Sequence, residues 1–275
     1  MTMTAPLRRV LVRRPGEVGR WREFGWRSAP DPARIVEEHE GFVAALESAG
    51  VEVVVGAPLD SALDAIYVHD PAALTSGGAI LLRPGKELRQ VEVEAIEVDF
   101  AAAGVGVIAR LEVPATAEGG DMLWLDDQTL VVGRGYRTND AGIEALRRAL
   151  PDVDVIAVDL PHYHGRDEVM HMLSLTSPLA DDLAVVYLPL MPVRLVELLE
   201  ARGVGFVEVP DDEFESMACN VLALGPRRAL TLDGNPETRR RLEAAGVEVA
   251  VYSGEELSRK GDGGPTCLTR PLARG

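Results

Sequence analysis

The stretch ALESAGVEVVV, residues 45–55, contains the end of an amphipathic helical pattern, a glycine and an apolar strand-like run. A glycine directly after a helical pattern predicts a helix end, because glycine adopts a left-handed backbone at little cost. The valines that follow predict a buried strand. The same form occurs four more times: DFAAAGVGVIA (99–109), LRRALPDVDVIAV (146–158), LLEARGVGFVEV (198–209) and RLEAAGVEVAV (241–251).

These recurrences indicate a repeat architecture. The residues that mark them lie about 43 to 54 positions apart: Gly50, Gly104, Asp152, Gly203 and Gly246. Two strand-like runs precede the helical pattern in the later units, for example GDMLWL (120–125) and TLVVGRG (129–135) in the third. Each unit is therefore predicted to have the order strand, strand, helix, strand.

Five such units predict a five-bladed, pseudo-symmetric α/β propeller with strands around a central channel and helices outside. No single unit can cover its apolar faces alone, and closing the units into a ring buries them. An ordinary open α/β sheet with helices between its strands is the alternative. We expect residues 1–275 to form one domain. In a ring, the starts of the first strands of all units should point to the same end of the channel.

Composition excludes several classes of function. The net charge of -16 argues against a nucleic-acid partner, because phosphates would be repelled. The N-terminus lacks the apolar segment of a signal peptide, and no apolar run reaches the roughly 18 to 20 residues that cross a bilayer. We expect a cytoplasmic protein with no membrane association. Its two cysteines, Cys219 and Cys267, form neither a disulfide framework nor the paired spacing of a zinc site.

Polar residues recur where the first strand of each unit is expected. The segment around Cys267 is expected to return the chain to the same end of the channel. Each has a structural explanation when taken singly, such as a loop acid or a core histidine. Together they combine a nucleophilic thiol, a histidine that exchanges protons near neutral pH, and carboxylates suited to a planar cation such as guanidinium. The four residues that carry this chemistry are Asp70, Glu118, His171 and Cys267; His69, Asp121, Cys219 and Asn220 are expected at the same end of the channel, and Cys219, in an apolar run, is expected to be structural.

Three motifs carry a resemblance to a known group of enzymes. They are EGGD (118–121), HMLS (171–174) and GGPTCLTRPL (263–272). In this order they resemble the guanidino-group-modifying enzymes, which comprise dimethylarginine dimethylaminohydrolase, arginine deiminase and the amidinotransferases, all five-bladed pentein propellers. The resemblance extends over essentially the whole chain, and the bacterial dimethylarginine dimethylaminohydrolases look most similar.

The resemblance implies a mechanism without a metal or an organic cofactor. Cys267 would be the nucleophile that forms a covalent thiouronium intermediate, and His171 would protonate the departing amine and then activate water. Glu118 and Asp70 would hold the guanidinium nitrogens. The remaining predicted substrate-binding residues are Asp64, a further acidic position; Arg89 and Arg137, for the substrate carboxylate; His69, where the hydrolases carry glutamate; and Asp121.

The predicted substrate is a small cationic guanidino compound, most simply Nω-methylated arginine hydrolysed to citrulline and an alkylamine. Leu173 stands where arginine deiminases place an acid, which argues for a substituted guanidinium. Arginine deiminase and amidinotransferase activities with the same Cys267 are the alternatives. A non-enzymatic propeller is another, as is a metal site built from HYH (162–164) with Asp167, Glu168 and His171. A homodimer is compatible with the sequence.

Overall fold

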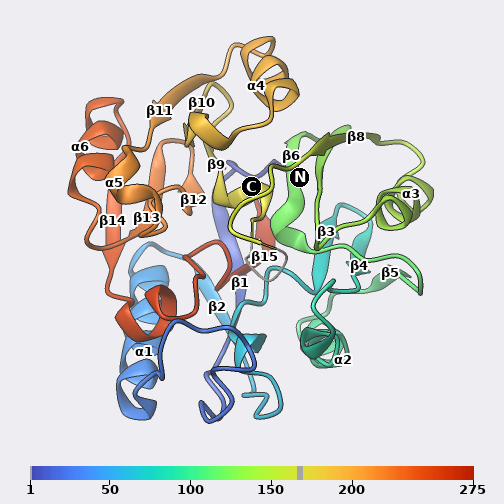
Figure 1. Ribbon diagram of the computed structural model, residues 1–275, viewed down its shortest axis with the longest axis vertical. Helices are drawn as coiled ribbons and strands as arrows, with labels where there is room; N and C mark the ends of the chain where they lie inside the picture. The colour runs from blue at the N-terminus through green and yellow to red at the C-terminus, as the bar shows by residue number, and fades with distance from the viewer. Residues whose placement is uncertain (1, 166–169) are drawn as a thin grey trace.

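The computed structural model describes residues 2–165 and 170–275 and consists of five three-stranded sheets. The sheets surround a common centre with the larger helices at the periphery, so the predicted five-bladed α/β propeller is confirmed (Figure 1). The strands are β1 (Leu7–Arg13), β2 (Glu52–Gly56), β3 (Ala72–Thr75), β4 (Gly78–Leu81), β5 (Val107–Arg110), β6 (Met122–Asp126), β7 (Thr129–Arg134), β8 (Asp154–Asp159), β9 (Thr176–Ala180), β10 (Leu183–Val186), β11 (Gly205–Glu208), β12 (Leu222–Gly225), β13 (Arg228–Leu232), β14 (Glu248–Tyr252) and β15 (Arg270–Arg274).

Every sheet has the same topology. A middle strand pairs antiparallel with one neighbour and parallel with the other, and the helix of the unit connects the two parallel strands. The antiparallel neighbours β15, β3, β6, β9 and β12 are the inner strands. The α-helices are α1 (Pro32–Ser48), α2 (Glu92–Ala102), α3 (Asp140–Ala149), α4 (Val193–Glu200), α5 (Asp211–Phe214) and α6 (Pro236–Ala244).

The first sheet joins the two ends of the chain. Its order is β15-β1-β2, and β15 pairs antiparallel with β1, with Leu11 opposite Arg270. The residues after Cys267 were expected only to return the chain to the channel, so this strand adds to the predicted fold. Because the last strand completes the first sheet, we propose that residues 1–275 fold as a single domain.

The predicted glycine helix ends are present in four units. Gly50, Gly104, Gly203 and Gly246 have φ of 84°, 76°, 74° and 81°. In each case the valine that follows donates its N–H to a carbonyl five residues back, as Val51 does to Leu46 at 3.1 Å. The left-handed glycine and this hydrogen bond end the helix, and the chain then enters the outer strand. The third unit ends its helix at Leu150 instead, before Pro151-Asp152.

The segments before the inner strands differ from the prediction. DAIYVHDPA was expected to be a strand with His69 and Asp70 at its end, but Leu63–Ile66 is a 3₁₀ helix and both residues precede β3. Likewise Met172–Ser174 is a 3₁₀ turn ahead of β9. Their buried apolar residues gave a strand-like pattern although the backbone turns. Polar side chains therefore lie in tight turns at the start of the inner strands.

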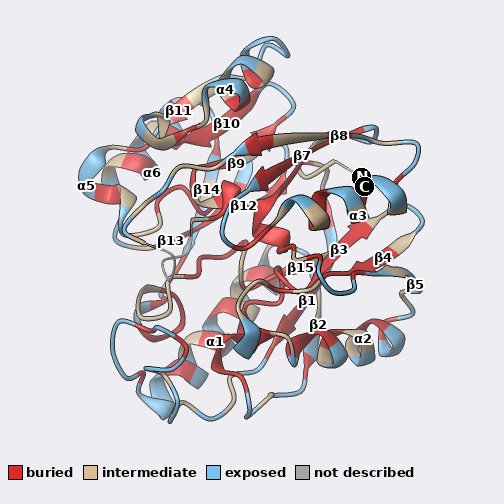
Figure 2. Cartoon of the chain, turned by 45° about the vertical axis from the view of Figure 1, so that its right-hand side comes forward, coloured by how far each residue is buried: buried red, intermediate tan, exposed pale blue. Residues whose placement is uncertain are grey.

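The core lies between the sheets and the helices. Strands are mostly buried and the outer helix faces are exposed (Figure 2). Phe42 and Leu46 of α1, for example, are fully buried against Val10 of β1 and Leu230 of β13. Each helix thus covers one sheet and the gap to its neighbour, which holds the turns of the inner strands in fixed positions.

Replacing a helix-end glycine should destabilise the fold by backbone strain alone. An added Cβ at Gly246 would meet no atom within 4 Å, but its φ is 81°. We expect Gly246→Ala to lower the free energy of unfolding by about 1 kcal/mol. Gly41, inside α1 and equally unobstructed, is the matched control: Gly41→Ala should raise it by about 0.5–1 kcal/mol. Denaturant titration of both variants measures this, and equal effects would contradict the helix-end assignment.

Candidate active site

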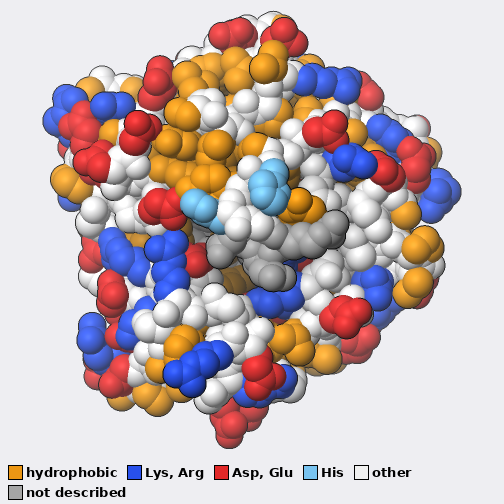
Figure 3. Space-filling view, in the orientation of Figure 1, with side chains coloured by type: hydrophobic (Ala, Val, Ile, Leu, Met, Phe, Trp, Pro, Cys, Tyr) orange, Lys and Arg blue, Asp and Glu red, His pale blue; other side chains and the backbone are white. Residues whose placement is uncertain are grey.

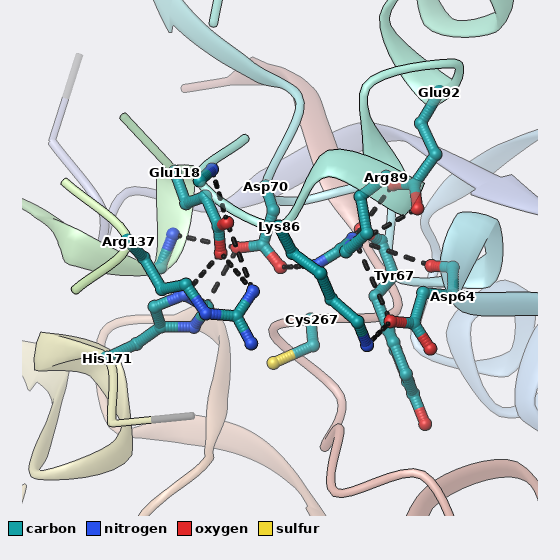
Figure 4. Close-up of polar contacts among 12 residues, drawn as sticks. Asp64, Tyr67, Asp70, Lys86, Arg89, Glu92, Glu118, Arg137, His171 and Cys267 are labelled. Atoms are coloured by element: carbon teal, nitrogen blue, oxygen red, sulfur yellow. Dashed lines mark hydrogen bonds and ion pairs between the residues drawn. The ribbon is translucent and has the colours of Figure 1, made fainter. Parts of the chain in front are cut away.

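The predicted catalytic side chains come together at one end of the propeller axis. Cys267, Asp70, Glu118 and His171 lie in the turns just before β15, β3, β6 and β9, and their side chains converge in Figure 4. The backbone links the turns as well: His69 N–H donates to the Cys267 carbonyl at 3.2 Å. The expectation that the starts of the inner strands face one end of the channel is met by these residues.

A buried ion pair lies at the centre of the site. His171 Nε2 is 2.7 Å from Glu118 Oε2, and His171 Nδ1 is 3.9 Å from Asp70 Oδ1. Burial alone would lower the pKa of His171, but Asp70, Asp121 and Glu118 outweigh burial and raise it to about 9. Burial would raise the pKa of Glu118, yet the hydrogen bond with His171 and the charge of Arg137 lower it well below its usual range. The histidine is therefore an imidazolium and the glutamate a carboxylate at neutral pH.

The thiol of Cys267 is partly buried beside this pair. Burial, followed by the negative charge of Asp70, raises its pKa to about 12. Asn220 opposes this shift, because its Nδ2 donates to Sγ at 3.1 Å while its Oδ1 accepts the Thr266 N–H at 3.0 Å. Asn220 was seen in the sequence as a polar residue at this level but was not assigned to the site.

The glycines before Cys267 allow its turn to pack closely. An added Cβ at Gly264 would lie 2.6 Å from the Asn220 side chain, and one at Gly263 would lie 2.1 Å from the ring of Tyr67. Gly120 has the same function in the EGGD motif, since its Cβ would lie 2.4 Å from His171 Nδ1. Both glycine-containing motifs are thus explained by close approach to residues of the site.

Arg89 lies against Asp70. Its Nη1 donates to Asp70 Oδ2 at 2.6 Å, and its Nε and Nη2 each donate to Glu92 at 2.9 Å. The residue is buried, and a further donation to the Tyr67 carbonyl leaves its guanidinium surrounded by protein acceptors. Burial would raise the pKa of Asp70, but His171 and Arg89 lower it. In this structure Arg89 orients the Asp70 carboxylate; carboxylate binding by Arg89 stays a prediction.

Arg137 faces Glu118 from the other side. Its Nη1 donates to Glu118 Oε1 at 3.2 Å, and the Gly85 N–H donates to the same oxygen at 2.9 Å. Arg137 also lines an open pocket with Tyr136 and Met170. It therefore connects the carboxylate of the site to a space that reaches the surface.

Asp64 is bonded to Lys86 and Trp26, two residues that were not predicted from the sequence. Lys86 Nζ is 2.7 Å from Asp64 Oδ2, and Trp26 Nε1 donates to Asp64 Oδ1 at 2.8 Å. Figure 4 shows Lys86 extending past Cys267 to reach Asp64. The one signal in the sequence was composition, because Lys86 is one of two lysines among mostly arginine cations.

Two predicted residues occupy other positions. Asp121 accepts a hydrogen bond from Thr138 Oγ1 at 2.6 Å and from the Met172 N–H at 3.3 Å, so it holds the turn that carries His171. Burial raises its pKa to about 7. His69 forms a 2.9 Å hydrogen bond through Nδ1 with the Thr269 carbonyl, and its side chain lines a pocket on the propeller axis. Burial and the charge of Arg270 lower its pKa to about 3, so it is neutral.

Asp70, Glu118 and His171 offer ligand atoms within 4.8 Å of one another, a geometry that could hold a metal ion. Arg89 and Arg137 already engage the two carboxylates, so a metal ion would have to displace these ion pairs. Of the alternative metal site, His162 bonds the Tyr136 hydroxyl at 2.8 Å, and Asp167 and Glu168 lie outside the described residues.

The fold and this residue set define the class. Five pseudo-symmetric sheets with Cys267, His171 and two carboxylates at the start of the inner strands place the chain in the guanidino-group-modifying, or pentein, superfamily. The model of the family "N,N dimethylarginine dimethylhydrolase, eukaryotic" matches residues 28–274. The chain belongs to this dimethylarginine dimethylaminohydrolase family.

Relatives and solved structures agree with this membership. A dimethylarginine dimethylaminohydrolase of Streptomyces coelicolor is 32% identical over 268 residues, which is 96% of each chain. A mutant of the Pseudomonas aeruginosa enzyme in complex with citrulline superposes with a TM-score of 0.80 at 26% identity, covering 96% of this chain and 98% of the other. An amidinotransferase of Microseira wollei, at 17% identity and a TM-score of 0.81 over 99% and 96% of the chains, shares the fold.

The surface adds two observations. Among the described residues, no helix has both the length and the apolar character needed to cross a membrane. In Figure 3 apolar side chains gather toward α4, whose first residue, Val193, is 73% exposed. The homodimer stays a prediction.

The ion pair of His171 should make stability depend on pH. The pKa of about 9 in the folded state lies above the usual 6.5, so the stabilisation is complete below pH 6.5 and is lost as pH rises through 9. We expect the free energy of unfolding to fall by about 2 kcal/mol between pH 7 and 9. Denaturant titrations at several pH values test this. His171→Gln should flatten the slope, and an unchanged slope in that variant would contradict the assignment.

Proposed function

We propose that the protein hydrolyses Nω-methylated arginine to citrulline and an alkylamine by way of a thiouronium on Cys267. One observation supports the proposal above the others: a thiol, an imidazolium and two carboxylates from four different blades meet in one site. A purely structural role would not bring these groups together, because burying charged groups costs free energy. Membership of the dimethylarginine dimethylaminohydrolase family supplies the substrate class.

Substrate binding would begin with the guanidinium between Asp70 and Glu118. Carboxylates that accept hydrogen bonds from its nitrogens orient the planar cation and fix the reacting carbon near sulfur. Arg137 lines the open pocket beside Glu118 and suits the substrate carboxylate, whereas Arg89 is bonded to both Asp70 and Glu92. Leu173 is buried in an apolar cluster, so it adds no charge to the site.

The cationic substrate would also activate the thiol. Asp70 contributes to the raised pKa of Cys267, and a guanidinium bound to Asp70 offsets that charge. The thiol proton leaves to solvent, and the thiolate attacks the guanidinium carbon and forms the C–S bond. The C–N bond to the alkylamine then breaks as His171 delivers a proton to the departing nitrogen.

Hydrolysis of the intermediate would use the same histidine. Having lost its proton, His171 can accept one from a water molecule, whose oxygen attacks the thiouronium carbon. The C–S bond breaks, the ureido group of citrulline forms, and Cys267 is regenerated. Glu118 keeps the imidazole oriented through the 2.7 Å contact in both half-reactions.

A panel of substrates tests the proposal. Arginine, monomethylarginine, asymmetric dimethylarginine and agmatine are incubated with the protein, and the ureido product and released amine are quantified. We expect kcat/KM to be highest for a methylated arginine. Release of ammonia from arginine as the fastest reaction would favour a deiminase, and a product that forms only with an added amine acceptor would favour an amidinotransferase.

The two cysteines provide a matched pair of variants. Cys267→Ser should lower kcat by at least about a thousandfold, because the alcohol is a far weaker nucleophile than the thiolate. Cys219 is buried, its Sγ faces the Leu175 carbonyl at 3.5 Å, and burial raises its pKa far above the usual value. Cys219→Ser should therefore retain most of the activity. Turnover by Cys267→Ser close to that of the parent would rule out the mechanism.

A further inference from the structure

A separate pocket lies on the propeller axis between the inner strands β15, β3 and β6. We call it the axial pocket; its polar lining comprises Arg270, Arg274, His69 and Thr2, and Met122 and Trp124 are among its apolar walls. Its cavity volume is about 50 Å³, which suits only a small ligand. Cys267, Glu118, Asp70 and His171 do not line it, so it is distinct from the site described above.

Arg270 brings an uncompensated charge to this pocket. The residue is 6% exposed, and its Nε has no hydrogen-bond partner. Within residues 2–165 and 170–275 its side chain forms neither a hydrogen bond nor an ion pair. Burial lowers the pKa of Arg270 to about 9. Asp70 opposes this shift, and the like charge of Arg274 adds to it. A buried guanidinium without an acceptor is costly, because the lost hydration is not replaced.

Arg274 adds a second positive charge to the same space. Its Nη1 donates to the Ala5 carbonyl at 2.7 Å, and no carboxylate of the described chain pairs with it. Burial lowers its pKa to about 10. The acid that acts on Arg270, Asp70, is itself bonded to Arg89 at 2.6 Å and to the Gly120 N–H at 3.0 Å. Among the described residues, no free carboxylate therefore neutralises the two arginines.

We propose that the axial pocket binds a small monovalent anion between Arg270 and Arg274. Guanidinium groups present several N–H donors in a fixed plane, and they bind anions through charge-assisted hydrogen bonds. The walls provided by Met122 and Trp124 favour a weakly hydrated anion, such as a halide or formate. A doubly charged anion such as sulfate would lose more hydration in this apolar setting.

Neutral His69 is compatible with such a ligand. Its Nδ1 is committed to the Thr269 carbonyl, and the ring lines the pocket. An imidazole with its proton on Nδ1 carries no net charge and does not compete with the arginines for the anion. Trp124, of intermediate exposure, presents an apolar surface rather than a carboxylate. The lining thus contains cations and neutral groups but no acid.

Two measurements on the full chain test the proposal. In crystals grown in sodium bromide, anomalous scattering should locate a bromide between the guanidinium groups of Arg270 and Arg274. In solution, chloride, formate and sulfate are compared at equal ionic strength by thermal unfolding. We expect chloride or formate to raise the melting temperature by about 2–4 °C with saturation, and sulfate to do less. The comparison of chloride with formate distinguishes a halide ligand from a carboxylate ligand.

Variants separate specific binding from a general salt effect. Arg270→Met should abolish the saturable shift and should be at least as stable as the parent at low salt, because it removes a buried unpaired charge. Arg239→Met removes an exposed charge that pairs with Glu243 on α6, and it should keep the shift. If Arg270→Met does not fold, Arg274→Met and the bromide map take its place. An absent bromide peak, or an equal shift in the parent and the Arg270 or Arg274 variant, would overturn the proposal.

Discussion

The contact between the His171 imidazolium and the Glu118 carboxylate is the interaction on which the site depends. Both groups are almost fully buried, so each is stable as an ion only because the other lies 2.7 Å away. Asp70 extends the pair, and Arg89 and Arg137 supply the opposite charges behind it. The propeller makes this arrangement possible, because turns from different blades meet at one end of a common axis.

That geometry explains how much the sequence could predict. A helix end with glycine and a following valine is a local feature: the Gly50 turn is formed by hydrogen bonds to Glu47 and Leu46. Five such local signals predict the order of strands and helices along the chain. The ring follows because the units bury their apolar faces only when they pack against one another. The site residues were recognisable because Glu118, His171 and Cys267 lie in three short motifs whose order along the chain resembles that of the guanidino-group-modifying enzymes.

What the sequence could not provide are contacts across blades. The pairing of β15 with β1 joins residues more than 250 positions apart, and the five residues RPLAR, with a proline and two arginines, are a weak strand signal. The link between Lys86 and Asp64 and that between Asn220 and Cys267 also cross between turns. For Arg89 the resemblance gave a role in binding substrate, whereas the fold directs its guanidinium to Asp70 and Glu92.

The charge balance of the site connects structure to chemistry. The site contains four cations and four acids, so its charges are close to balance. The cations are His171, Arg89, Arg137 and Lys86, and the acids are Asp64, Asp70, Glu118 and Glu92. Burial raises the pKa of Glu92 to about 7. Addition of a guanidinium to a buried set that is already near balance favours loss of a proton elsewhere. The thiol of Cys267 is the neutral acid beside Asp70, so substrate binding and formation of the nucleophile would be one event. A cysteine that is inert without substrate and reactive with it is protected from oxidation and metal capture, because both require the thiolate.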